Sequence, residues 1–342
     1  MSMTMLSEPN IVPSAKKELT FAQALNESLR EAMTRDPSVF LMGEDIGPYG
    51  GLFRVTEGLY QEFGSQRVLD TPITEQAIIG FGVGAAMVGS RPIVELQFSD
   101  FMALAMDQIV NQAAKARYMS GGQLSVPLII RTPVGTGLGS QHTQSLEAWL
   151  MHVPGLHIAM PATPYDAMGL LRTALELNDP VLFLEHSMLY STRGEVPVDP
   201  YKVPFGEARI VRQGSDVTVI AVSSGVTVAA KVADELAAEQ GVSVEVIDPR
   251  TLAPFDMATI VASVQKTNRA IVFHQACRTC GIGAEIGQRI MEEAFDYLDA
   301  PVTRVAARDV PNPQAKSLEM VVLPSEQDLK RAINSVLYRS PA

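Results

Sequence analysis

The alternation of short β-branched runs with longer segments of helical period constrains the fold of this chain more than any other feature. It begins where Thr20 can cap a helix with Phe21, Leu25, Leu29 and Met33 on one face. Longer helical segments are predicted at 99–119 and 164–177, and strand candidates at 39–42, 67–69, 93–96, 128–130, 157–160 and 181–184. Because parallel strands need helical crossovers, the pattern predicts an α/β fold with a mainly parallel sheet and helices on both faces.

A polar stretch interrupts this alternation and divides the chain. Residues 190–206 contain Pro197, Pro200 and Pro204, a composition typical of an interdomain linker. Alternation then resumes, with strand candidates at 217–222, 242–247, 270–273 and 302–305 and helices near 226–239, 284–295 and 325–337. We therefore predict a mobile tail at 1–17, a first domain at 18–189, a linker at 190–206 and a second, smaller domain at 207–342.

Charge and composition narrow the class of function. The chain has 342 residues, of which 46% are hydrophobic and 19% charged, so it is long enough for two ordinary globular domains. The 27 Lys and Arg against 38 Asp and Glu give a net charge of −11, with no compact basic run. We therefore expect no nucleic-acid partner.

Cysteine usage and hydropathy indicate the compartment. Two cysteines cannot form a disulfide framework, which favours a reducing environment. The longest apolar stretch, 77–89, is shorter than the roughly 20 residues of a membrane-spanning helix. We expect no membrane segment and a cytoplasmic location.

The segment Asp70-Thr-Pro-Ile-Thr-Glu75 follows a strand candidate and precedes an apolar, glycine-punctuated run. Pro72 and Thr74 can open a helix, and Glu75 then lies in the first turn, where the helix dipole favours a carboxylate. The apolar residues that follow can desolvate Glu75 enough for it to hold a proton or a strong hydrogen bond. From these residues alone, a helix carboxylate without a chemical role is the better interpretation.

The glycine-rich segment at 135–142 also follows a strand candidate and ends in His142. A flexible backbone there can approach a ligand and present His142 as an acid, a base or a hydrogen-bond donor. A surface loop with a solvated histidine is supported equally well.

Cys277-Arg-Thr-Cys280 has the spacing of a redox pair and lies between a strand and a helix. One such pair cannot build a four-thiolate zinc site, and two unpaired thiols are the favoured interpretation. A thiol oxidoreductase using Cys277 and Cys280 nevertheless stays an alternative of a different class.

Nine short segments share their order and spacing with one known family. They are GED at 43–45, GLFRVTEG at 51–58, DTPITE at 70–75, RPIVELQF at 91–98, DQI at 107–109, YMSGG at 118–122, QHTQ at 141–144, PGL at 154–156 and IDPRTL at 247–252. With them the chain resembles the beta subunit of the thiamine-diphosphate-dependent decarboxylating component of 2-oxo acid dehydrogenase complexes. That family includes pyruvate, branched-chain 2-oxo acid and acetoin dehydrogenases.

The resemblance implies a pyrimidine-binding domain followed by a transketolase C-terminal-like domain. Glu75 would hydrogen-bond the aminopyrimidine of thiamine diphosphate and favour the imino tautomer that removes the thiazolium proton. The resemblance places Ile73, Gln97 and Phe101 along the pyrimidine pocket, with Glu44 nearby. It places His142 near the substrate, where an imidazolium can stabilise developing charge or assist acyl transfer to a lipoyl group.

The chain has no Gly-Asp-Gly segment followed by Asn, the family's diphosphate and magnesium motif. The resemblance implies that an alpha subunit supplies it, holding Mg²⁺ within an α2β2 heterotetramer that docks on a lipoyl acyltransferase core. A structural potassium ion would map to Leu128, Ala174, Leu175, Leu177 and Asp179.

The substrate markers point in two directions. Gln97-Phe98 resembles pyruvate and branched-chain members, whereas Tyr118-Met-Ser-Gly-Gly122 and Asp248-Pro-Arg-Thr-Leu252 resemble acetoin members. The expected function is oxidative decarboxylation of pyruvate or a branched-chain 2-oxo acid. An acetoin dehydrogenase beta subunit and a noncatalytic binding subunit stay open as alternatives.

Overall fold

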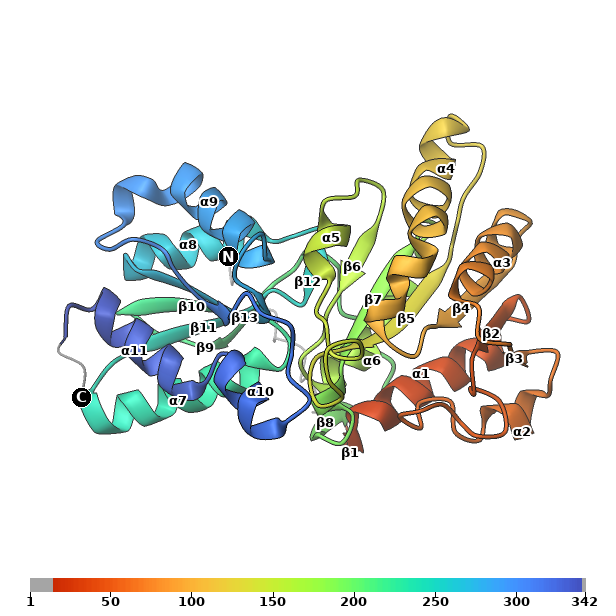
Figure 1. Cartoon of the computed structure of the whole chain (residues 1–342), viewed down its shortest axis with the longest axis horizontal. Coiled ribbons are helices and arrows are strands. Elements are labelled where there is room, and N and C mark those ends of the chain that lie inside the picture. The colour runs from red at the N-terminus through yellow and green to blue at the C-terminus, as the bar shows by residue number, and fades with distance from the viewer. Residues whose placement is uncertain (1–14, 340–342) are drawn as a thin grey trace, which may run out of the picture.

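The computed structural model describes residues 15–339, which form two α/β halves side by side (Figure 1). The elements of the first half are β1 (Lys16–Thr20), α1 (Phe21–Arg35), β2 (Val39–Gly43), α2 (Leu59–Phe63), β3 (Val68–Asp70), α3 (Glu75–Met87), β4 (Arg91–Glu95), η1 (Ser99–Ala105), η2 (Gln108–Ala113), α4 (Ala114–Met119), β5 (Ile129–Val134), α5 (Glu147–Met151), β6 (His157–Ala159), α6 (Pro164–Ala174), β7 (Val181–His186), η3 (Ser187–Leu189) and β8 (Arg193–Pro197). Strands and helices alternate through most of this half, as the sequence predicts.

The first half is built on a seven-stranded sheet in the order β12-β6-β7-β5-β4-β2-β3. All its pairings are parallel except that of β12 with β6. Strand β12 (Thr251–Ala253) comes from the second half of the chain, so the two halves share this sheet.

Helix α1 forms as its sequence predicts. Thr20 and Gln23 make a reciprocal capping box at its start, which satisfies backbone N–H groups that the first turn leaves without partners. Its buried face includes Phe21, Leu25 and Leu29, none of which is accessible to solvent. The hydrophobic periodicity and the N-terminal cap that the sequence predicts are therefore both present in the folded chain.

The segment predicted to be helical over 99–119 is helical throughout, but it is not one regular α-helix. The structure instead has a 3₁₀ helix, η1, then a π-helical turn, η2, and only then α4. The start of this region is tied to the loop after β5, because the Ser99 hydroxyl donates to the Gln144 carbonyl at 2.7 Å and the Gln144 amide donates to Asp100 at 2.8 Å. These long-range bonds fix the start of η1 against the loop after β5.

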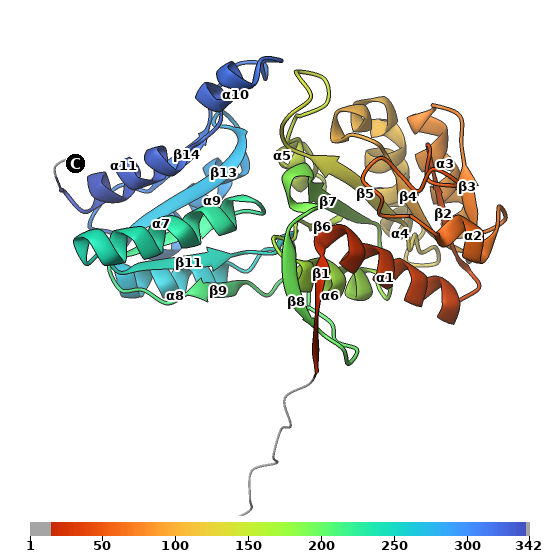
Figure 2. The same ribbon diagram turned by 90° about the horizontal axis from the view of Figure 1, so that it is seen from below.

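The segment predicted as a linker contains a strand. β8 pairs antiparallel with β1 to form a small two-stranded sheet beside α1 and α6 (Figure 2). β1 includes Lys16 and Lys17, which the sequence analysis assigns to the tail, while the tail residues 1–14 lie outside the described residues. Prolines around β8 are compatible with this pairing because both strands of the ribbon are edges.

The second half has a five-stranded sheet in the order β14-β13-β10-β11-β9, in which only the edge strand β9 is antiparallel. Helices α7 and α11 cover one face of this sheet and α8 and α9 the other (Figure 1). Its elements are β9 (Arg209–Arg212), β10 (Val217–Ala221), α7 (Gly225–Gln240), β11 (Val244–Asp248), α8 (Met257–Thr267), β13 (Ala270–Cys277), α9 (Ile282–Ala294), η4 (Phe295–Tyr297), β14 (Thr303–Ala307), α10 (Lys316–Val322) and α11 (Glu326–Val336). Within residues 15–339, no helix combines the length and apolar character needed to cross a membrane.

Candidate functional site

Four neighbouring parallel strands end at the same edge of the seven-stranded sheet, and the predicted site residues follow them. Glu44 comes directly after β2, Glu75 after β3, Gln97 after β4 and His142 after β5. Because the carboxyl ends of parallel strands meet at one edge, segments far apart in the sequence converge there. This edge is the candidate functional site.

Glu75 is the first residue of α3 and is buried, with 7% of its surface exposed. Thr74 precedes it without making a side-chain cap. Across residues 15–339, no hydrogen bond or ion pair is made by the Glu75 carboxylate. A buried carboxylate at the positive end of a helix, with no donor among the described residues, is suited to accept a hydrogen bond from a ligand.

Glu44 and Asp45 place further negative charge beside Glu75. Burial raises the pKa of Glu44, and the charges of Asp45 and Glu75 raise it further. The Gln97 amide lies 3.4 Å from an Asp45 carboxylate oxygen, which links the segments after β2 and β4. Ile73 lies just before α3 and is 73% exposed, so it offers an apolar surface next to these acids.

Two phenylalanine rings hold His142 in place. The ring centroids of Phe98 and Phe101 lie 4.7 Å and 5.5 Å from that of His142, and both pairs are edge to face. His142 is half-buried, and its backbone N–H donates to the Gly139 carbonyl at 3.3 Å. Its imidazole is therefore packed against the segment after β4 and is not freely solvated. This is the arrangement expected if the loop presents His142 to a ligand.

A buried ion network lies beneath this edge, and sequence analysis did not identify it. Arg131 on β5 donates to Glu95 on β4 at 2.6 Å and makes two bonds of 2.7 Å to Glu185 on β7. The Tyr190 hydroxyl also donates to Glu185 at 2.7 Å. The only sequence signal was charged residues inside otherwise apolar strand runs, and such residues need partners when buried.

The residues predicted to bind potassium lie around the turn between α6 and β7. Their oxygens already have donors: Arg91 donates to the carbonyls of Leu175 at 2.9 Å and Leu177 at 3.2 Å, and Arg117 pairs with Asp179 at 2.7 Å. The Leu128 carbonyl accepts from the Val181 N–H at 2.8 Å. Among the described residues, no group of three or more His, Cys, Asp or Glu side chains could hold a metal ion.

Cys277 and Cys280 are both free and exposed. Burial of its sulfur raises the pKa of the Cys277 thiol, and the charge of Asp309 raises it further. A redox-active cysteine needs a lowered pKa, so the structure does not favour the thiol oxidoreductase hypothesis.

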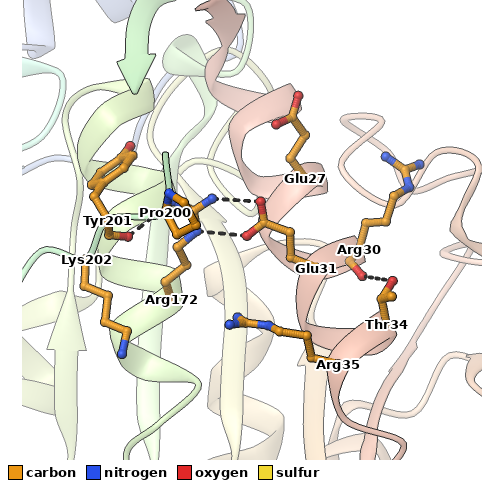
Figure 3. Close-up of a pocket in the computed structure, with 9 residues that line it drawn as sticks. All are labelled: Glu27, Arg30, Glu31, Thr34, Arg35, Arg172, Pro200, Tyr201 and Lys202. Carbon is orange, nitrogen blue, oxygen red and sulfur yellow. Dashed lines mark hydrogen bonds and ion pairs between the residues drawn. The ribbon is translucent and has the colours of Figure 1, made fainter. Parts of the chain in front are cut away.

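A groove of about 940 Å³ lies elsewhere, between α1, α6 and the residues after β8 (Figure 3). Arg172 makes two bonds to Glu31, at 2.8 Å and 2.9 Å, and its guanidinium lies 5.1 Å from the centre of the Tyr201 ring. Arg172, the most buried charged residue of the groove, is therefore already paired. None of the predicted site residues lines the groove.

Comparison with known proteins assigns both halves of the chain. Residues 17–192 match the transketolase pyrimidine-binding domain and residues 206–329 match the transketolase C-terminal domain. A solved structure described as a split-gene transketolase, an inactive beta4 tetramer, superposes with a TM-score of 0.77 at 21% identity, covering 94% of this chain and 98% of that chain. The fold and its domains thus define a two-domain transketolase-like protein.

Curated relatives narrow the class. The chain is 47% identical to pyruvate dehydrogenase E1 component subunit beta-2 of Oryza sativa subsp. japonica, covering 96% of this chain and 88% of that protein. It is 46% identical to subunit beta of Rhizobium meliloti, covering 94% and 70%, and 44% identical to subunit beta of Rickettsia felis, covering 94% and 99%. The chain belongs to the family of E1 component beta subunits of the 2-oxo acid dehydrogenases. The acetoin alternative is not favoured, because these relatives are named for pyruvate dehydrogenase.

Proposed function

We propose that this chain is the beta subunit of a thiamine-diphosphate-dependent E1 component that oxidatively decarboxylates pyruvate and transfers the acyl group to a lipoyl group. The observation that carries the proposal is Glu75, a buried carboxylate at the start of α3 without a donor among residues 15–339. It lies in the part of the chain that matches a pyrimidine-binding domain.

The residues around Glu75 fit the aminopyrimidine end of the cofactor. Bound thiamine diphosphate supplies the electron sink for the loss of carbon dioxide. Glu75 would accept a hydrogen bond from a ring N–H of the pyrimidine and so favour the tautomer that carries a proton there. Ile73, Gln97 and Phe101 would lie along the ring, and Glu44 would add negative charge beside it.

His142 has the geometry of a positioned proton donor. Its ring packs edge to face against Phe98 and Phe101, and a bound 2-oxo acid would lie beside it. At that place an imidazole can stabilise negative charge that develops on the substrate, or move a proton during acyl transfer. Because the packing fixes the ring beforehand, little reorganisation is needed during the reaction.

The chain is incomplete as a catalyst because it lacks the diphosphate and magnesium motif. The proposal therefore includes an alpha subunit in an α2β2 heterotetramer that supplies most Mg²⁺ ligands, with a lipoyl acyltransferase as acyl acceptor. Two free cysteines suit a reducing compartment, and the proposed location is the cytoplasm.

A structural potassium ion is a further part of the proposal. The carbonyls of Leu175 and Leu177 converge on one guanidinium nitrogen of Arg91, and Leu128, Ala174 and Asp179 would contribute to the same oxygen-rich turn. Each carbonyl has a second lone pair that a hard cation can use. Replacing potassium by tetramethylammonium is expected to lower the melting temperature of the complex by a few degrees, because a ligand that binds only the native state stabilises it. Identical melting curves in both salts would remove potassium from the proposal.

Substitution of Glu75 tests the core of the proposal. In a complex with the alpha subunit, Glu75→Gln and Glu75→Ala are each expected to lower kcat about 10²- to 10⁴-fold, the size of a general acid–base contribution. The assay follows carbon dioxide release from pyruvate, branched-chain 2-oxo acids and acetoin in parallel, with an artificial oxidant.

The matched control is Glu62→Gln, which removes a carboxylate paired with Arg30 on the surface and should leave turnover unchanged. Near-normal turnover by Glu75→Ala would contradict the assignment. An inactive wild-type heterotetramer would instead support a noncatalytic binding subunit.

A further inference from the structure

The loop that carries His142 is held by the C-terminal half of the chain. The Gly137 N–H donates to a Glu319 carboxylate oxygen at 2.8 Å, and the Ser140 hydroxyl donates to the Asn312 carbonyl at 2.6 Å. The Asn312 side-chain amide donates in return to the carbonyl and the hydroxyl of Thr143, both at 3.0 Å. Contacts from the other half therefore lie on both sides of His142.

Glu319 belongs to α10, and Asn312 lies in the segment between β14 and α10. Figure 2 shows α10 beside the loop that follows β5, at the boundary between the two halves. A cavity of about 390 Å³ lies at this boundary and is lined by residues of both halves, among them Ser140, Thr143, Cys277 and Asn312. The four hydrogen bonds thus bridge a boundary that is not packed solid.

The backbone of this loop has few conformational preferences of its own. Gly135, Gly137 and Gly139 have φ angles of +99°, +112° and +81°, in the region that favours glycine. Such a segment loses much conformational entropy when it is ordered, so contacts from outside must fix it. At Gly135 the close approach is also steric, because an added Cβ would lie 2.5 Å from the His186 ring.

Hydrogen bonds from the first half reach only the ends of the loop, while Phe98 and Phe101 pack against the His142 ring. Ser187 donates to the Thr136 carbonyl at 3.2 Å, and Gln144 is bonded to Asp100. Between these ends, the internal bond from the Thr143 hydroxyl to the Gly139 carbonyl closes the turn at 2.6 Å. The middle of the loop depends on Asn312 and Glu319, whose bonds reach Gly137, Ser140 and Thr143.

Losing these bonds would cost free energy because two of the residues that make them are buried. Glu319 is 7% exposed and Thr143 is 3% exposed, so water cannot readily replace the protein partner of either residue when its hydrogen bond is lost. The bond to Glu319 is also charge-assisted, since a carboxylate accepts it.

We propose that Asn312 and Glu319 are positioning residues for His142, so that the C-terminal half sets the placement of the histidine in the reaction. The inference rests on the proposed function, because it assigns the placement a catalytic consequence. Asn312 and Glu319 act through the loop and do not touch the substrate themselves.

Because each bond has a known donor and acceptor, substitutions can remove or reverse one of them at a time. Asn312→Asp keeps the shape but replaces the donor by an acceptor that faces the Thr143 carbonyl, so it should be at least as harmful as Asn312→Ala. Glu319→Ala removes the acceptor of the Gly137 N–H, whereas Glu319→Gln keeps an acceptor oxygen and should recover most of the activity. Glu326→Gln is the matched control, because Glu326 pairs with Lys231 inside the C-terminal half.

The variants are assayed as complexes with the alpha subunit. We expect Asn312→Asp and Glu319→Ala to lower kcat for pyruvate about 10- to 100-fold, the effect of misplacing a reacting group, with a smaller change in KM. Hydrogen exchange of residues 137–143 should accelerate about tenfold, while the melting temperature of the complex changes little.

A double-mutant cycle separates positioning from general damage. If Asn312 acts through His142, Asn312→Asp should have almost no further effect on kcat when His142 is already changed to Asn. Full additivity of the two substitutions would overturn the proposal, as would a wild-type kcat and unchanged exchange in Asn312→Asp and Glu319→Ala.

Failure of the proposed function has a different signature. A wild-type complex without turnover on any substrate would remove that function and the catalytic consequence with it. The exchange measurement would then still show whether Asn312 and Glu319 hold the loop.

Discussion

The two large sheets of this molecule differ in how their buried charges are paired. In the first sheet, Arg131 joins Glu95 and Glu185, and the side chains of Arg131 and Glu185 are 2% and 0% exposed. In the second sheet, the buried carboxylate of Glu245 pairs with Lys266, whose side chain is 44% exposed. The first sheet keeps a closed network between its strands, whereas the second lets its cation reach water.

The pKa shifts of the two glutamates follow this difference. Burial raises the pKa of Glu95, and the Arg131 charge does not fully compensate. Burial also acts on Glu245, but hydrogen bonds from Lys266, Ser263 and the Gly214 N–H outweigh it and lower its pKa. Burying the charge of Glu95 thus costs desolvation energy. The pairing with Arg131 also fixes the position of Glu95, which lies just before Gln97 and Phe98 in the chain.

Breaking the closed network should give the largest effect. Arg131→Met leaves two carboxylates without their cation and is expected to lower the free energy of unfolding by about 3–5 kcal/mol. Lys266→Met is the matched change in the second sheet and should cost about 1 kcal/mol, since Glu245 keeps its other donors and its cation was half-exposed. Urea denaturation of the two variants checks this ordering, and equal losses would refute the contrast.

One buried histidine in each large sheet, His186 on β7 and His274 on β13, gives an effect of intermediate size. Burial lowers the pKa of His186 on β7 to about 4, against a small opposing effect of Gln275, and burial with the Arg304 charge lowers that of His274 on β13 to about 4. Between about pH 6.5 and 4 the unfolded chain takes up protons that the native chain does not. The contribution of these two histidines to the free energy of unfolding should therefore fall as the pH falls through this window, by about 3 kcal/mol for each histidine at its lower end.

Substitution distinguishes the two histidines. Among the described residues neither ring nitrogen of His274 has a hydrogen-bond partner, whereas His186 contacts Gln275 and accepts from the Met188 N–H at 3.2 Å. His274→Gln should remove about half of the fall that the two histidines contribute, with little loss at pH 8, while His186→Gln should also lose stability at pH 8. Denaturation at pH 8, 6 and 4.5 measures both, and an unchanged slope in His274→Gln would show that His274 does not titrate in this window.

The candidate site was predictable from the sequence to the extent that it depends on local order. Strands followed by Glu44, Glu75, Gln97 and His142 could be recognised, and parallel pairing then brings their ends to one edge. The roles of these residues came from the family resemblance and stay predictions. The network of Arg131 could not be found in this way, because nothing local says which carboxylates will face an arginine on a neighbouring strand.

The sequence by itself determined the elements whose signals lie within a few residues: the cap of α1 by Thr20, the start of α3 at Glu75 and the alternation of strands with helices. Only the tertiary structure decided that residues 99–119 break into three helical segments, that β8 pairs with β1, and that Asn312 and Glu319 hold the loop of His142. The physical reason is the range of the interactions. Caps and hydrophobic period act along the local backbone, whereas these other features depend on hydrogen bonds between residues far apart in the chain, which exist only once the core has formed.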